Sequence, residues 1–136
     1  MILLDTSALF AYFCPSDPHH ARMTEFMSDA SDPLIVSPYV VSELDYLVGR
    51  RMGQQAELMV LEELSSGSYE MPVVGPIDLS ACRHVIGRYF DLRIGVTDAS
   101  LVILADRYGT VNIATFDRRH FTALRSLDGK PFTLLP

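Results

Sequence analysis

Long apolar runs are missing from this sequence of 136 residues. Its longest uninterrupted apolar stretches fall far short of the roughly 20 residues that a membrane-spanning helix needs. The first residues, MILLD, place no basic segment ahead of an apolar one, so they do not resemble a secretory leader. We therefore expect a cytoplasmic protein with no membrane partner.

Cysteine is also scarce. The chain has two cysteines, Cys14 and Cys82, which lie far apart and belong to no CxxC pair or Cys/His cluster. This spacing favours two reduced, buried thiols over a disulfide or a zinc site.

Basic residues are outnumbered, with 11 Lys and Arg against 17 Asp and Glu, for a net charge of -6. A protein that holds nucleic acid by bulk electrostatics carries the opposite sign. Either nucleic acid is not the partner, or part of the acidity is reserved for metal ions. The positions of the acids have to separate these two explanations.

Apolar residues are plentiful, at 49% of the chain, which suits one folded domain over residues 1–136. Short apolar runs predict five strands, at Ile2–Leu4, Leu34–Ser37, Met71–Val74, Val111–Thr115 and Phe132–Leu135. Helical patterns fall at Ser7–Phe13, Pro18–Ser28, Tyr39–Arg51, Gln54–Ser65, Leu79–Phe90, Asp98–Tyr108 and Arg119–Arg125. This alternation predicts an α/β fold with a mainly parallel sheet of about five strands.

Two carboxylates follow predicted strands directly. Asp5 ends the first strand, and Asp117 follows the fourth, two residues after Thr115. In a parallel sheet, ligands bind beyond the carboxyl ends of the strands, so both acids are candidate site residues. Helix capping explains each of them equally well, because Asp often caps the helix that follows a strand.

Two further carboxylates lie on predicted helices. Glu43 falls on the apolar stripe of its helix, at helical spacing from Val40 and Leu44, whereas Asp45 points away. Asp98 lies in the first turn of its helix, where it is either a cap or a site residue. Glu43 is too far into its helix to act as a cap, and Glu is rarely buried unless it is paired.

The four acids together favour one shared site over four separate coincidences. No basic residue neutralises them within the predicted core pattern, which points to a divalent cation. Oxygen donors without His or Cys favour Mg²⁺ or Mn²⁺ over Zn²⁺.

The segments around these acids resemble a known family. They read DTS at Asp5, VVSEL at Glu43, VTDAS at Asp98 and ATFDRRHF at Asp117. In order and spacing they resemble the acidic quartet of PIN-domain ribonucleases, and most closely that of the VapC toxins of bacterial toxin-antitoxin pairs. The resemblance covers nearly the whole chain.

The resemblance implies a three-layer α/β/α sandwich, the PIN domain, in which the four acids are catalytic and bind one or two Mg²⁺ or Mn²⁺ ions. Asp5 and Asp98 are then direct ligands, and Glu43 and Asp117 bind directly or through water. The implied toxin is a metal-dependent endoribonuclease that hydrolyses structured RNA, such as a tRNA or rRNA loop, and so inhibits translation. Attack by metal-activated water would leave 5′-phosphate and 3′-OH ends. The alternative is a non-catalytic scaffold with a vestigial acidic pocket.

Ser7 and Thr115 are expected to donate hydrogen bonds that orient the ligand carboxylates. A helix cap explains Ser7 as well, and an ordinary strand position explains Thr115.

Three arginines flank the acidic segments: Arg93, Arg118 and Arg119. They are candidate contacts to RNA phosphates, and solvated helix ends are an equally compatible interpretation. For His120 we expect a surface or packing role rather than a contact to RNA.

The family implies two protein partners. One is a VapB-like antitoxin, which typically places a basic side chain in the acidic pocket, and the other is a second copy that forms a homodimer. The predicted helix Gln54–Ser65 has more apolar residues than one face needs, namely Leu58, Met59, Val60, Leu61 and Leu64. With the preceding helix it is a candidate docking pair, and ordinary core packing is the alternative.

Overall fold

A sheet of four parallel strands forms the centre of the computed structural model, which describes residues 1–136. The strands are β1 (Ile2–Leu4), β2 (Leu34–Val36), β3 (Asn112–Ala114) and β4 (Thr133–Leu135), in the spatial order β2-β1-β3-β4. All three strand pairs are parallel. The prediction of an α/β fold with a parallel sheet is therefore confirmed.

One of the five predicted strands, Met71–Val74, is wrong, because the structure has no strand there. Only Glu70 reaches the sheet, through one parallel bridge to Ile35. The Glu70 N–H donates to the Leu34 carbonyl at 2.8 Å, and its own carbonyl accepts from the Val36 N–H at 2.9 Å. The ladder ends there because Pro72 has no N–H to donate.

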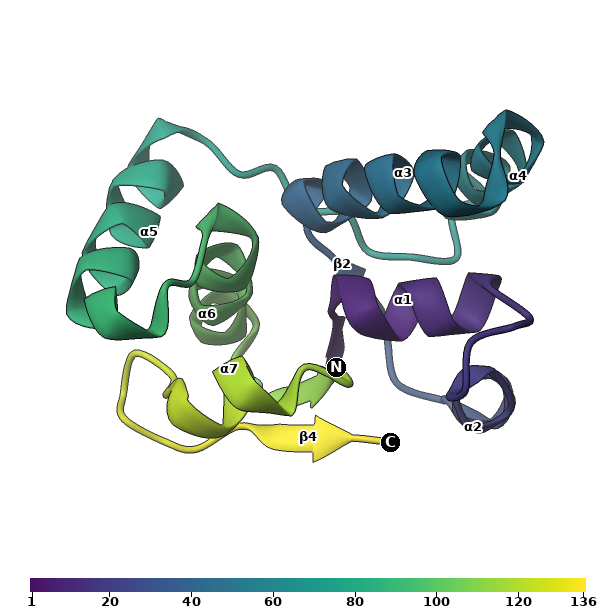
Figure 1. Cartoon of the computed structure of the whole chain (residues 1–136). Helices are drawn as coiled ribbons and strands as arrows, with labels where there is room; N and C mark the ends of the chain where they lie inside the picture. Colours follow the sequence, from purple (N-terminus) through teal and green to yellow (C-terminus); the bar gives the residue numbers. More distant parts are fainter.

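Seven α-helices and one 3₁₀ helix surround the sheet. They are α1 (Thr6–Phe13), α2 (His20–Asp29), α3 (Pro38–Met52), α4 (Gln54–Leu64), α5 (Pro76–Arg88), η1 (Phe90–Leu92), α6 (Val96–Tyr108) and α7 (Arg118–Ala123). In Figure 1, α5 and α6 lie on one side of the strands and α1 and α2 on the other, while α3 and α4 form an adjacent pair. None of these helices combines the length and the apolar character needed to cross a membrane.

Most helices lie within a few residues of their predicted bounds. Helix α2 begins at His20, two residues later than predicted. The Asp17 carboxylate accepts the His19 N–H at 2.8 Å and so stabilises a turn before the helix. Gly109 ends α6 in the left-handed region at φ 61°, a conformation that glycine adopts without strain.

Helix α6 is buried over a continuous run, Ala99–Ala105. A helix that is apolar on all sides lies inside a protein, and α6 packs against α3, α5 and β1. The buried cysteines, Cys14 and Cys82, are both free thiols, as predicted. Because α6 is fixed along its length, its first turn is held rigidly near the carboxyl ends of β1 and β3.

Candidate functional site

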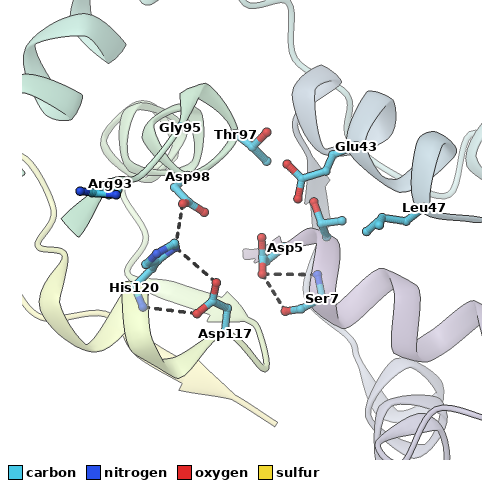
Figure 2. Close-up of a pocket in the computed structure, with 11 residues that line it drawn as sticks. Asp5, Ser7, Glu43, Leu47, Arg93, Gly95, Thr97, Asp98, Asp117 and His120 are labelled. Carbon is cyan, nitrogen blue, oxygen red and sulfur yellow. Dashed lines mark hydrogen bonds and ion pairs between the residues drawn. The ribbon is translucent and has the colours of Figure 1, made fainter. Parts of the chain in front are cut away.

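The four predicted acids line one pocket of ≈ 320 Å³. It opens where β1 and β3 end, and Figure 2 shows acids facing it from opposite sides. Eleven residues line it: Asp5, Thr6, Ser7, Glu43, Leu47, Arg93, Gly95, Thr97, Asp98, Asp117 and His120. Leu47 is the single apolar member of this lining.

Asp5 is the most buried of the four acids, with 4% of its surface exposed. Its Oδ2 accepts hydrogen bonds from the Ser7 hydroxyl at 2.7 Å and from the Thr115 hydroxyl at 2.8 Å. It also accepts the Ser7 backbone N–H at 3.4 Å, so Asp5 caps α1 as well as facing the pocket. Burial raises the pKa of this carboxyl, and the hydroxyl hydrogen bonds oppose that rise.

The two hydroxyls also join the segments that carry Asp5 and Asp117. The Ser7 hydroxyl accepts the Phe116 N–H at 2.9 Å, and the Thr115 hydroxyl accepts the Asp117 N–H at 3.0 Å. Each hydroxyl therefore donates one hydrogen bond to Asp5 and accepts one from a backbone N–H in the loop after β3. This arrangement fixes the β1–α1 junction relative to the β3–α7 loop, and it places Ser7 and Thr115 beside the acids as expected.

Asp98 is the third residue of α6, whose N-cap is Gly95, so the capping interpretation of Asp98 is wrong. Burial raises the pKa of its carboxyl to about 6, and the negative charge of Asp5 adds to the rise. The charges of Asp117 and Glu43 act in the same direction, whereas His120 opposes them. The four acids thus repel one another across the pocket.

His120 was assigned a surface or packing role, and the structure corrects this. Its Nδ1 lies 3.0 Å from Asp98 Oδ2 and 3.3 Å from Asp117 Oδ2 (Figure 2). Asp117 caps α7 by accepting the His120 N–H at 3.4 Å, and this places His120 in the first helical turn, facing the pocket. The spacing of three residues from Asp117 was the available signal, because residues three apart share a helix face.

Glu43 is exposed, although its spacing predicted an inward-facing side chain. The buried stripe of α3 consists of Val40, Leu44 and Val48. Glu43 and Leu47 lie at the edge of this stripe and face the pocket. The pocket itself keeps Glu43 in contact with solvent. The period of the helix identified the correct face but not the opening beside it.

The three arginines differ in position. Arg93 lines the pocket and adopts a left-handed backbone conformation with φ 55°, which is rare for a residue other than Gly. Arg118 and Arg119 are exposed and follow Asp117, but they are not part of the pocket lining. No Lys or Arg forms an ion pair with the four acids, so their charge is opposed only by His120.

The donor set of the pocket fits a hard divalent cation. Carboxylate and hydroxyl oxygens predominate, and Asp5 Oδ1 is engaged by no hydrogen bond. In this structure no group of three or more Asp, Glu, His or Cys side chains is arranged to hold a metal ion. The fit therefore rests on the chemistry of the donors and on the unneutralised negative charge.

Known proteins share this fold and sequence. The PIN domain family model matches residues 2–127. The chain is 49% identical to Ribonuclease VapC26 of Mycobacterium tuberculosis, over 99% of this chain and 100% of the relative. The structure of VapC20, a Sarcin-Ricin loop cleaving toxin of M. tuberculosis, matches with a TM-score of 0.81 at 20% identity, covering 86% of this chain and 90% of that one. VapBC2 from Rickettsia felis, bound to a DNA fragment from their promoter, matches with a TM-score of 0.71 at 14% identity over 100% of both chains. The chain therefore belongs to the PIN-domain family and, within it, to the VapC group.

Proposed function

We propose that the protein is a metal-dependent endoribonuclease, the toxin of a toxin-antitoxin pair, which cleaves cytoplasmic RNA and so inhibits translation. The observation that carries this proposal is the convergence of Asp5, Glu43, Asp98 and Asp117 on one pocket without a Lys or Arg partner. Such charge repulsion is costly unless a cation relieves it. The relative VapC26 is named as a ribonuclease, which supports the same chemistry.

Mg²⁺ or Mn²⁺ at this pocket would supply positive charge to the phosphoryl oxygens and lower the pKa of water to the neutral range. Asp5 and Asp98 are the proposed direct ligands, and Glu43 and Asp117 complete the donor set. Hydrogen bonds from Ser7 and Thr115 fix one oxygen of Asp5, so its carboxylate is oriented before any ion arrives.

Arg93 is the proposed phosphate contact inside the pocket. Its guanidinium is the one Arg or Lys group in the lining, and its left-handed backbone stores strain of a kind that clusters at functional sites. Arg118 and Arg119 are exposed next to Asp117, and we propose them as contacts to phosphates outside the pocket. The small number of basic groups favours an unpaired loop of tRNA or rRNA over a long duplex.

The proposed protein partner is a VapB-like antitoxin, and a second copy forms a homodimer. A solved toxin-antitoxin complex from Klebsiella pneumoniae contains a chain of this fold. The α3–α4 pair exposes apolar side chains: Tyr46 at 63%, Leu58 at 64% and Met59 at 66%. This surface suits partner docking, while Val60 and Leu64 of α4 are core residues. A basic antitoxin side chain in the acidic pocket would compete with the metal for the same charge.

The decisive experiment incubates antitoxin-free protein with total cellular RNA and Mg²⁺ or Mn²⁺, and maps the new 5′ ends. We expect one or a few sites that EDTA abolishes, with 5′-phosphate and 3′-OH products. Ends bearing 2′,3′-cyclic phosphate would show instead that the RNA 2′-OH is the nucleophile.

Two variants on one helix provide the matched control. Asp98→Asn removes a pocket acid, whereas Asp106→Asn changes an exposed acid of α6 outside the pocket. Loss of cleavage in Asp98→Asn alone supports the nuclease. A folded wild-type protein that cleaves nothing, and still binds a partner, would favour the non-catalytic scaffold.

A further inference from the structure

Two aromatic rings stack on one another beside the acidic pocket. The imidazole of His19 lies parallel to the ring of Phe116, with ring centroids 4.1 Å apart and an angle of 7° between the planes. His19 comes from the loop between α1 and α2, and Phe116 comes from the loop between β3 and α7. The stack therefore joins segments that are distant in the sequence.

The position of Phe116 is set by the acidic site itself. Phe116 lies between Thr115, which donates to Asp5, and Asp117, which lines the pocket. Its backbone N–H donates to the Ser7 hydroxyl at 2.9 Å, and that hydroxyl donates to Asp5 at 2.7 Å. Phe116 therefore adjoins Asp117 in the sequence, and the Ser7 hydroxyl links its backbone N–H to Asp5.

His19 is held in place from its own loop. The Asp17 carboxylate accepts the His19 N–H at 2.8 Å, and the neighbouring His20 imidazole contacts the Ala11 carbonyl at 2.9 Å. Phe116 is half-buried under the stack, whereas His19 is exposed. The Phe116 side chain is therefore partly covered by the protein, and the His19 side chain is exposed to solvent with its ring already oriented by the stack.

We propose that the stacked rings of His19 and Phe116 form a platform for an unpaired nucleobase next to the phosphate that the acidic pocket receives. This inference rests on the proposed ribonuclease function and adds a substrate contact to it. Flat rings bind the faces of unstacked bases, and a pre-oriented ring loses little conformational entropy on binding. Every base has such a face, so the platform favours single strands over duplexes without selecting one base. It also supplies binding energy that a chain of net charge -6 does not obtain from bulk electrostatics.

The test compares two short probes that differ only in their bases. One is a fluorescent hexauridylate RNA, and the other is a hexamer of the same ribose-phosphate backbone without bases. Binding is measured by fluorescence anisotropy in Ca²⁺ at fixed salt. We expect the wild type to bind hexauridylate about tenfold more tightly than the abasic hexamer, since stacking of one base contributes that order of affinity.

The variants address each ring. His19→Ala combined with Phe116→Leu removes both aromatic faces while keeping an apolar side chain in the half-buried position, and we expect it to abolish the preference for bases. His19→Trp enlarges the exposed ring and should retain or increase the preference. His84→Ala is the matched control, because His84 is an exposed histidine on α5 outside the pocket. Circular dichroism and thermal unfolding establish that each variant is folded.

A folded double variant that still prefers hexauridylate by the wild-type factor would overturn the platform. Cleavage of total RNA by the same wild-type preparation distinguishes this outcome from a failure of the proposed function. If the wild type cleaves RNA and the double variant shows the wild-type preference, the platform is wrong and the nuclease stands. If the wild type neither cleaves RNA nor discriminates between the probes, both are wrong.

Discussion

Two paired acids outside the pocket, Asp78 and Asp128, differ in their electrostatics from the acids inside it. Outside the pocket, Asp78 Oδ1 lies 2.6 Å from Arg107 Nη2, and Asp128 Oδ2 lies 2.6 Å from Lys130 Nζ. A hydrogen bond from the Gly75 N–H lowers the pKa of Asp78, and a hydrogen bond from Arg107 adds to this effect. A hydrogen bond from Lys130 lowers the pKa of Asp128. In the pocket, burial and mutual repulsion raise the pKa of Asp98 instead.

The contrast separates acids that pair with Arg or Lys from pocket acids that have no such partner. Asp78 closes the first turn of α5 through the Gly75 N–H at 2.8 Å and joins α5 to α6 through Arg107. Asp5 and Asp98 lack any such cation, although they are the more buried acids. A surplus of unneutralised charge in the less solvated place identifies the site more reliably than the number of acids does.

The largest expected effect is on catalysis. Asp5→Asn should reduce metal-dependent RNA cleavage by about a thousandfold or more, because it removes a proposed ligand charge. Asp128→Asn should leave the rate unchanged. Initial rates on the mapped RNA site measure both variants. An equal loss in the two would erase the distinction between the groups of acids.

The second effect is on stability as a function of pH. The pKa of Asp98 is raised from 3.8 to about 6, so its contribution to the free energy of unfolding is full below pH 4 and is lost as pH rises through about 6. The change amounts to about 3 kcal/mol in the metal-free protein. Urea unfolding in EDTA between pH 4 and 7 should show a weaker pH dependence for Asp98→Asn. An unchanged slope would contradict the burial and repulsion described for this carboxyl.

The third effect is stabilisation by the metal. Mn²⁺ at about a hundred times its Kd should raise the free energy of unfolding of the wild type by about 2 to 3 kcal/mol. The gain should shrink as pH falls below about 6, because the protonated Asp98 no longer binds a cation. Thermal unfolding with and without EDTA provides the measurement. A similar gain in Asp5→Asn would place the ion elsewhere.

The smallest effect concerns the paired group. Asp78→Asn should lower the melting temperature by a few degrees, because it weakens both the α5 cap and the contact to Arg107. RNA cleavage per folded molecule should stay at the wild-type rate. Lost cleavage with an unchanged melting temperature would assign Asp78 a role in catalysis, like that proposed for the pocket acids.

The sequence predicts most of the fold because its strands are continuous apolar runs and its helices have clear ends. Asp5, Asp98 and Asp117 are predictable for the same reason, since each lies at the boundary of a regular element. The prediction of a strand at Met71–Val74 failed because it followed the apolar run and gave too little weight to Pro72, which has no N–H and limits the pairing to a single bridge. Helical period placed Glu43 on the right face but does not describe an opening between helices.

The spacing of His120 from Asp117 indicates only that the two residues share a helix face. No local pattern predicts the stack of His19 on Phe116. His120 joins the pocket because Asp117 caps α7, which begins at Arg118, and the first turn of α7 brings His120 within 3.0 Å of Asp98 on α6. The stack needs two loops, about a hundred residues apart in sequence, to meet. Both depend on tertiary packing, which short-range periodicity does not contain.

The strand order β2-β1-β3-β4 has a consequence for biosynthesis. Asp5 lies 110 residues before Thr115 in the chain, yet its backbone N–H bonds to the Ala114 carbonyl at 3.0 Å and its side chain accepts a hydrogen bond from the Thr115 hydroxyl. The pocket is complete only when the loop after β3, which carries Asp117, lies beside Asp5. A ribosome that carries a copy of this chain shorter than Asp117 therefore carries no assembled acidic pocket.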